Sequence, residues 1–223
     1  MSRPKRPRGE RRTLPAVHFD PAEHPGLRPP GFRHALYGAL VIPRPIGWVT
    51  TTSAEGVVNL APFSFSNLVA SDPLCFMYCA NGAHREGGAK DSLHNARETS
   101  EFVFNLCTWD LREQMNATSA SSPRSVDEMA EAGLEAAPSV VVRPPRVAAS
   151  PIALECRVVQ VVDLPSSETT TNAMVIGQVV QVHIADEVVV DGMVDLTGLR
   201  ALGRLGYQDY TVVREAFTMV RPD

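Results

Sequence analysis

The chain has 223 residues, which fits one large domain with additional segments better than two full domains. Apolar residues make up 44% of it, so a substantial core can form, and the net charge of −4 argues against nucleic acid as the main partner. The chain contains no run of about 18 uncharged apolar residues, and we therefore expect no membrane span. Its basic N-terminus lacks the apolar stretch of a secretory signal, which predicts a cytoplasmic protein.

Residues 1–30 differ in composition from the rest of the chain. They are rich in Arg and Pro and show no hydrophobic period, so we interpret them as a mobile or loosely docked arm. A solvated tail is the simplest role for this arm, although its charge also suits contact with nucleic acid or an acidic partner. Residues 31–223 are predicted to form the folded domain.

The first half of this domain is predicted to begin with strands. Residues 45–52 are rich in β-branched and aromatic side chains, and a turn at 54–56 separates them from a second run at 57–61. This pattern is typical of a hairpin. Residues 74–80 and 101–107 are two further apolar runs of strand length.

Three short helices are expected, at residues 91–99, 110–118 and 125–132. The first contains no proline and begins with Asp91, a residue type suited to an N-cap. In the third, Ser125 precedes Glu128 by three residues, which is the spacing of a capping box. The helices are therefore predicted to start at these capping residues.

The last third of the chain returns to strands, at residues 153–161, 174–184 and 187–196. In the first of these, Leu154 and Cys156 alternate with Glu155 and Arg157, which is typical of a strand with one buried and one exposed face. Many strands joined by tight turns, with the helices grouped between them, predict a mainly β fold. We expect a closed or nearly closed antiparallel β-barrel with peripheral helices.

The four cysteines, Cys75, Cys79, Cys107 and Cys156, are scattered, and three lie in apolar runs. We therefore expect free, buried thiols rather than disulfides. Cys75 and Cys79 lack C-x-x-C spacing and no pair of histidines stands nearby, so no metal site is predicted. The chain also lacks the G-x-S-x-G and H-E-x-x-H signatures of hydrolases and the glycine-rich loops of parallel nucleotide-binding folds.

Two segments carry polar groups that suit a ligand. Residues 59–67 (NLAPFSFSN) interleave small and hydroxyl residues with two phenylalanines, which suits the polar edge of a planar heterocycle. Residues 85–92 (REGGAKDS) contain a glycine pair that precedes a predicted helix start. The free backbone amides there, together with Lys90 and Ser92, suit a phosphate. Taken singly, each segment also fits a structural role, the first as a strand that turns a corner and the second as an ordinary capped helix.

Six stretches of the chain resemble, in order, the flavin reductase-like family of FMN-binding split barrels. They are PRPIGWVTT (43–51), NLAPFSFSN (59–67), GGAKDSLHN (87–95), EFVFNL (101–106), SPIALECRV (150–158) and RLGYQDY (204–210). Any one alone is a weak signal, whereas six in register are strong. The resemblance implies an antiparallel, Greek-key split β-barrel that forms a homodimer with FMN near the subunit interface.

The resemblance also assigns residues to the cofactor site, with FMN as the cofactor and FAD as the alternative flavin. The residues that it places against the isoalloxazine are Thr50, Thr51, Ala61, Pro62, Ser64, Phe65 and Ser66, with Asn67 at the polar edge of the ring. It places Lys90 and Ser92 at the phosphate, and Arg204 and Tyr207 where the site closes. Because the flavin carries the chemistry, no catalytic side chain is predicted.

Three residues depart from the family pattern. Ser66 stands where a second aromatic residue is common, Ser92 where threonine is common, and Tyr207 where a second glycine is common. Ser92 retains a hydroxyl, so the departure at this position has little effect on phosphate binding. The other two departures change the side of the site that faces the substrate.

The reaction implied by the resemblance is hydride transfer from NADH or NADPH to flavin. The reduced flavin would pass to a separate monooxygenase or another redox partner. Two alternatives stay open at this point. The chain could keep its FMN bound and either serve as an electron carrier, as a flavoredoxin does, or reduce another substrate directly. It could also be a non-catalytic flavin-binding module.

Overall fold

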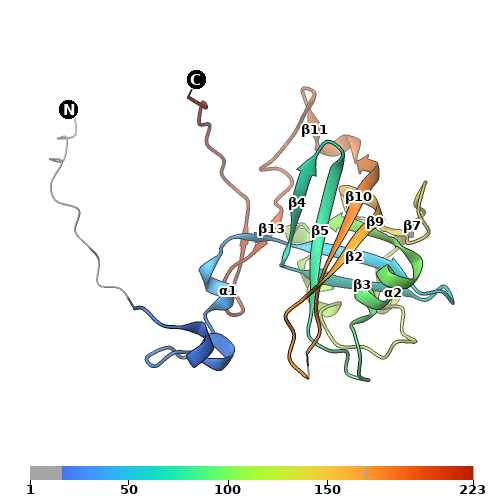
Figure 1. Cartoon of the computed structure of the whole chain (residues 1–223). Helices are drawn as coiled ribbons and strands as arrows, with labels where there is room; N and C mark the ends of the chain where they lie inside the picture. The colour runs from blue at the N-terminus through green and yellow to red at the C-terminus, as the bar shows by residue number, and fades with distance from the viewer. Residues whose placement is uncertain (1–16, 169, 223) are drawn as a thin grey trace, which may run out of the picture.

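The computed structural model describes residues 17–168 and 170–222 and is mainly β (Figure 1). Its strands are β1 Arg44–Pro45, β2 Gly47–Thr52, β3 Val58–Phe63, β4 Ser66–Ser71, β5 Leu74–Asn81, β6 Glu101–Leu106, β7 Ala136–Ala137, β8 Arg146–Val147, β9 Ile152–Leu164, β10 Asn172–Ile184, β11 Val189–Val190, β12 Met193–Val194, β13 Leu202–Arg204 and β14 Tyr210–Val212. Its helices are η1 Pro21–Glu23, η2 Pro25–Leu27, α1 Tyr37–Leu40, α2 Asp91–Thr99, η3 Trp109–Leu111, α3 Arg112–Ala117, α4 Glu128–Glu131 and η4 Asp186–Val188. None of the described helices is long and apolar enough to cross a membrane.

Seven antiparallel strands form the main sheet, in the order β3-β2-β6-β9-β10-β5-β4. The two edge strands, β3 and β4, are consecutive in the chain and are joined by only Ser64 and Phe65. Because so short a link cannot span a flat sheet of this width, the sheet has to curl until its edges meet. The backbone amide of Cys79 in β5 donates to the carbonyl of Phe65 at 2.7 Å, which fixes the closing corner. The predicted antiparallel barrel is confirmed.

Aromatic side chains fill the interior of the barrel. The ring centroids of Phe76 and Phe104 lie 4.7 Å apart, and those of Tyr78 and Phe102 lie 5.2 Å apart in an edge-to-face arrangement. Pairs at these distances contribute about 0.5–1.5 kcal/mol beyond the burial of their area. Gly177, at a register shift in β10, leaves room for this packing, because a Cβ at that position would collide with the Phe102 ring.

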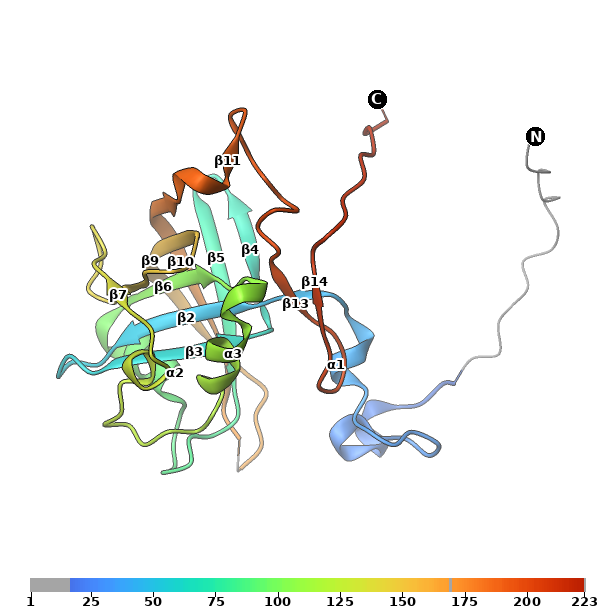
Figure 2. The same ribbon diagram turned by 180° about the vertical axis from the view of Figure 1, so that it is seen from behind.

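A smaller sheet stands beside the barrel and carries one wall of the site. It has the order β1-β13-β14, and α1 lies next to it (Figure 2). The described part of the N-terminal arm, residues 17–30, contains η1 and η2 and lies beyond α1, away from the barrel (Figures 1 and 2). Residues 1–16 lie outside the described range, so the mobility of the arm stays a prediction.

The expected strands and helices are present except over residues 187–196. The predicted strand there is wrong, because Asp191 and Gly192 adopt positive φ and turn the chain, so that η4 and the two-residue strands β11 and β12 form instead. Two helix starts also differ from the prediction. Helix α2 spans Asp91–Thr99 as predicted, but its N-cap is Lys90 and not Asp91. The third helix is shorter than predicted and is capped by Asp127, whose side chain accepts from the amide of Ala130 at 3.0 Å. The predicted capping box is therefore wrong, and the Glu128 side chain has a different role. All four cysteines are free, as predicted, but only Cys107 and Cys156 are buried, whereas Cys75 and Cys79 are half-buried.

Glu155 is the exception to the predicted alternation of β9, because its side chain is fully buried. Its Oε1 accepts from the amide of Val140 at 2.7 Å and contacts His183 Nε2 at 2.6 Å. Its Oε2 accepts from the amides of Val141 and Val142 at 2.6 and 3.1 Å. This carboxylate fastens the loop between β7 and β8 to the barrel, which is the physical reason that a charged residue occupies a buried position.

Replacing this carboxylate tests its structural role. Burial acts to raise the pKa of Glu155, but the hydrogen bonds from Val140 and His183 outweigh it, so the pKa is lowered from 4.5. We expect Glu155→Gln to reduce the free energy of unfolding by about 3 kcal/mol at neutral pH, because an amide cannot accept all these bonds. The deficit should shrink as the pH falls below 4.5, where the wild-type carboxylate also protonates. Denaturant unfolding measures both effects, with the exposed Glu135→Gln as control, and equal midpoints for the two variants would contradict the assignment.

Candidate functional site

Two adjoining cavities lie near the corner where the barrel closes. The larger encloses about 1090 Å³ and the smaller about 220 Å³. Pro62 of β3 and Ser119, which follows α3, line both cavities, so the two meet at these residues. The larger one lies just above the range of small-molecule sites, about 300–1,000 Å³.

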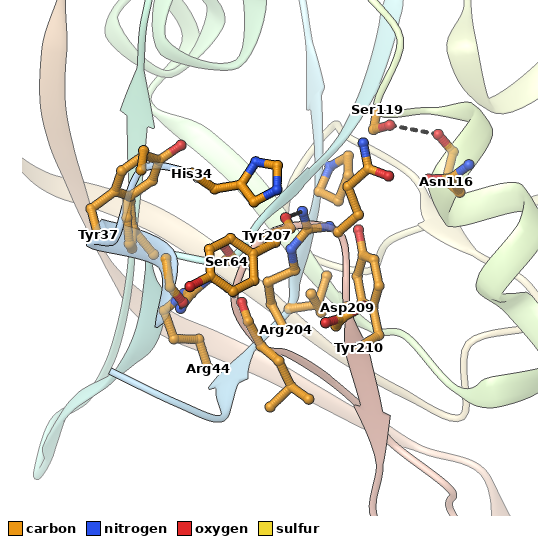
Figure 3. A pocket seen from close by; sticks show the side chains of 17 residues that line it. His34, Tyr37, Arg44, Ser64, Asn116, Ser119, Arg204, Tyr207, Asp209 and Tyr210 are labelled. Carbon is orange, nitrogen blue, oxygen red and sulfur yellow. Dashed lines mark hydrogen bonds between the residues drawn. The ribbon is translucent and has the colours of Figure 1, made fainter. Parts of the chain in front are cut away.

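Aromatic and cationic side chains from separate elements line the larger cavity (Figure 3). Ser64 and Phe65 come from the link that closes the barrel, Tyr37 from α1, and Tyr210 from β14. The rings of Tyr37 and Phe65 have centroids 6.4 Å apart, and the Arg204 guanidinium lies 4.3 Å from the centroid of Tyr210. Flat apolar walls with a few polar groups suit a planar heterocycle.

Arg44 holds one wall of this cavity in place. Its side chain is buried, and its terminal nitrogens donate to the carbonyls of Gly38, of Val41 at 2.8 Å and of Leu205 at 3.0 Å. These bonds tie α1 to the turn between β13 and β14. The terminal nitrogens of Arg44 therefore serve the architecture of the site, which leaves Arg204 as the more accessible cation.

Arg204 and Tyr207, the residues predicted to close the site, both line the larger cavity. The Arg204 side chain donates to the carbonyl of Tyr207, and the Tyr207 ring lies 5.3 Å from that of His34. Tyr207 has a φ of 60°, in the left-handed region that favours glycine. Such a conformation costs on the order of 1 kcal/mol, which explains physically why glycine is common at this position in the family.

The smaller cavity is built around the start of α2. Lys90 is the N-cap of the helix and Ser92 lies in its first turn, and both line the cavity. The first backbone amides of a helix lack intrahelical partners and carry the positive end of the helix dipole. A lysine at this end is unfavourable unless an anion is present, and within residues 17–168 and 170–222 Lys90 forms no ion pair. This arrangement suits a phosphate.

A chain of polar side chains connects this cavity to the core. Ser92 Oγ donates to Asn59 Oδ1 at 2.7 Å, and Asn59 Nδ2 donates to Glu128 Oε2 at 2.7 Å. The amide of Leu60 donates to the same Oε2 at 2.9 Å, and Thr51 Oγ1 donates to Asn59 Oδ1 at 3.2 Å. For Ser92 to donate to a ligand, its hydroxyl has to turn away from Asn59.

Glu128 is the site residue that the sequence analysis missed. Its side chain is buried and lines the smaller cavity. Burial raises the pKa of Glu128 to about 7; the hydrogen bonds from Leu60 and Asn59 oppose this shift, and the charges of Asp91 and Asp127 add to it. The capping-box spacing offered a sufficient local explanation for this glutamate, and no other signal in the sequence connects it to β3.

The predicted site residues fall into three groups. The larger cavity is lined by Pro62, Ser64, Phe65, Arg204 and Tyr207. The smaller cavity is lined by Ala61, Pro62, Lys90 and Ser92. Neither cavity is lined by Thr50, Thr51, Ser66 or Asn67.

The residues of the third group have other surroundings. Thr50 and Thr51 are fully buried in β2, where Thr50 Oγ1 accepts from Asn105 Nδ2 at 2.9 Å. Ser66 Oγ donates to the carbonyl of Phe63 at 3.0 Å, and Asn67 is exposed on the edge strand β4. Direct contact of these four residues with a cofactor stays a prediction.

The fold defines the class of the protein, an antiparallel β-barrel with two adjoining cavities at the corner where it closes. Residues 38–201 match the family described as the flavin reductase like domain. An uncharacterized protein of Halalkalibacterium halodurans is 38% identical over 188 residues, which are 84% of this chain and 89% of the relative. The chain therefore belongs to the flavin reductase-like family, as its motifs predicted.

Solved structures agree with this assignment. Nitrilotriacetate monooxygenase component B from Bacillus cereus is similar with a TM-score of 0.82 and 28% identity, over 93% of this chain and 100% of that one. The 2-nitrobenzoate 2-nitroreductase NbaA of Pseudomonas fluorescens is similar with a TM-score of 0.73 and 28% identity, over 84% of this chain and 89% of that one. The split-barrel fold is thus shared along most of each chain.

The raised pKa of Glu128 makes stability depend on pH. Because this pKa lies above the ordinary value of 4.5, the folded state holds the proton more tightly, and stability falls as the pH rises from 4.5 to about 7. In Glu128→Gln this loss is absent, so the variant should gain about 3 kcal/mol relative to wild type over that interval. Denaturant unfolding of the flavin-free protein at both ends of the interval measures the gain. A difference between wild type and variant that does not change with pH would contradict the prediction.

Proposed function

We propose that the protein is an NAD(P)H-dependent flavin reductase that binds FMN across the two cavities. The observation that carries this proposal is their opposite chemistry, with aromatic walls in the larger cavity and Lys90 and Ser92 at a helix start in the smaller. FMN has the matching parts, a planar isoalloxazine and a phosphate joined by a ribityl chain. Membership of the flavin reductase-like family supports the same class of ligand.

The residues of both cavities fit the two ends of this cofactor. Pro62 and Phe65 offer apolar walls to the ring, and the Ser64 hydroxyl offers a polar contact. The Lys90 ammonium and the first amides of α2 are suited to the phosphate. We favour FMN over FAD because a cavity of about 220 Å³ matches a terminal phosphate better than an additional nucleotide.

Bound FMN supplies the redox chemistry by accepting a hydride from NADH or NADPH. The residues of this chain bind and orient both ligands and limit the access of water to the ring. With about 1090 Å³, the larger cavity is wide enough to hold a nicotinamide beside the isoalloxazine. Because no acid or base is required, we expect no single side chain to be indispensable for turnover.

Anaerobic addition of NADH or NADPH to the protein with FMN tests this function. The proposal predicts that FMN binds and that its visible absorption band bleaches on addition of one of the two nucleotides. Binding without bleaching would contradict the reductase and favour the electron carrier, for which reduction by another protein is the next test. The absence of flavin binding would contradict both functions.

Removing the Lys90 ammonium, which we propose binds the phosphate, should distinguish binding of the phosphate from binding of the ring. We expect Lys90→Met to weaken FMN binding about tenfold to one-hundredfold, because one charge-assisted hydrogen bond is lost. Riboflavin, which lacks the phosphate, should bind both proteins equally. Fluorescence titration measures the affinities, with Arg97→Met in the last turn of α2 as the matched control. Equal losses for FMN and riboflavin would show that Lys90 does not contact the phosphate.

We propose in addition that two copies of the chain associate beside the larger cavity. Leu40, Val41 and Ile42 at the end of α1, with Leu68 and Val69 on β4, are each at least 50% exposed. Apolar side chains gathered at this density on a surface are typical of an interface. A homodimer formed there would cover the mouth of the larger cavity, in keeping with the FMN site near an interface that the resemblance implies.

A charge placed on this surface should separate the subunits. For Val41→Asp we expect a shift from dimer to monomer and weaker flavin binding, because the buried carboxylate would have no partner. Val159→Asp on β9 is the control, since Val159 is similarly exposed but belongs to a different strand. Light scattering measures the mass in solution. A wild-type protein that is monomeric at every concentration would contradict the proposal.

The partner and the compartment are part of the same proposal. A reductase of this kind would pass reduced FMN to a separate monooxygenase or another redox protein. Four free cysteines suit the reducing conditions of the cytoplasm, where we place the protein.

A further inference from the structure

A carboxyl group lies in the cavity that we assign to the phosphate of FMN. Glu128 begins α4, which packs against β3, and its side chain is 8% exposed. Both of its hydrogen bonds, from Asn59 Nδ2 and from the amide of Leu60, go to Oε2. In the described part of the chain, Oε1 accepts no hydrogen bond from protein groups. One oxygen of this carboxyl is thus fixed, and the other is available to a ligand.

The other acidic groups near Glu128 already have partners. Asp91 forms an ion pair with Arg124, and its Oδ2 lies 3.4 Å from His84 Nε2. Asp127 accepts from the amide of Ala130 as the cap of α4. Among the described residues no cation pairs with Glu128, and the cations that line the same cavity are Lys90 and, when protonated, His84.

This arrangement has a consequence for an anionic ligand. A cavity of about 220 Å³ brings the phosphate within a few ångströms of the carboxyl of Glu128. Repulsion between two anions at this range and in partial isolation from water is strong. A protonated carboxyl removes the repulsion and offers a hydrogen-bond donor to a phosphate oxygen.

We propose that Glu128 binds the FMN phosphate as a neutral carboxylic acid through Oε1, so that flavin binding takes up a proton. The inference rests on the proposed function, because it requires the phosphate to lie in the smaller cavity. It adds a cofactor-binding residue that lies outside the six stretches that resemble the family. It also makes FMN affinity decline with rising pH, while the affinity for riboflavin does not change.

The isosteric variant Glu128→Gln separates this role from a structural one. A glutamine can accept the bonds from Asn59 and Leu60 through its oxygen and can donate from its nitrogen, at every pH. The pKa of Glu128, about 7, places the expected change within an accessible range. Above that pKa, linkage predicts that the dissociation constant rises about tenfold for each pH unit.

The experiment is a fluorescence titration of FMN and of riboflavin at about pH 6 and about pH 8.5, with wild type, Glu128→Gln and the exposed control Glu135→Gln. We expect FMN affinity to fall by more than about tenfold across this range in wild type and Glu135→Gln, and by less than about threefold in Glu128→Gln. The second ionisation of the FMN phosphate, near pH 6, is common to all three proteins and therefore cancels in the comparison. Parallel pH profiles for wild type and Glu128→Gln would overturn the inference.

Calorimetry of the wild-type protein supplies a readout that needs no variant. At about pH 8, FMN binding measured in buffers of different ionisation enthalpy should take up close to one proton, and riboflavin binding should take up none. FMN binding without proton uptake would overturn the inference while leaving the proposed function intact. Failure to bind any flavin at either pH would overturn both.

Discussion

The two edges of the main sheet are joined by a link of two residues, Ser64 and Phe65, and the rest of the site depends on this constraint. The link requires the barrel to close, and the hydrogen bond from Cys79 to the Phe65 carbonyl holds the corner. The same corner turns Pro62 toward both cavities and Phe65 toward α1. The link that closes the barrel therefore also positions residues that line the cavities.

A second constraint is the pairing of charges around the smaller cavity, where some ionisable side chains have partners and others do not. Asp91 is neutralised by Arg124, and Asp127 serves as a helix cap. This arrangement leaves Lys90 without an ion-pair partner among the described residues and Glu128 without a cation, in the same small space. In the proposed complex, the phosphate compensates the charge of Lys90 and a proton neutralises the carboxyl of Glu128. Binding of the anionic ligand and protonation of Glu128 are then coupled, because both groups line the same cavity.

Much of the fold could be predicted because its strands have strong periodicity. The apolar runs that became β5 and β6 and the proline-free segment that became α2 carry their structure in local pattern. Local composition did not show that the strand at residues 47–52 is covered on both faces. β2 is buried at every position, so Thr50 and Thr51 both point into packed surroundings and neither lines a cavity.

The site was predicted in part, for a related reason. The segments 59–67 and 85–92 carry chemical signals of their own, and six of the residues in them that were assigned to the cofactor line the cavities. Glu128 and Glu155 could not be found in this way, because their partners are distant in the chain. The capping-box spacing offered a local explanation for Glu128, and the strand alternation offered one for Glu155. The positions of both side chains are determined instead by tertiary hydrogen bonds.

A crystal structure of the protein grown with FMN tests the central claim most directly, that the two cavities are the two halves of one flavin site. We predict that the phosphate lies within hydrogen-bond distance of Lys90 and Ser92 and that the isoalloxazine lies against Pro62 and Phe65. A phosphate located in the larger cavity, or a flavin bound elsewhere on the barrel, would contradict the account.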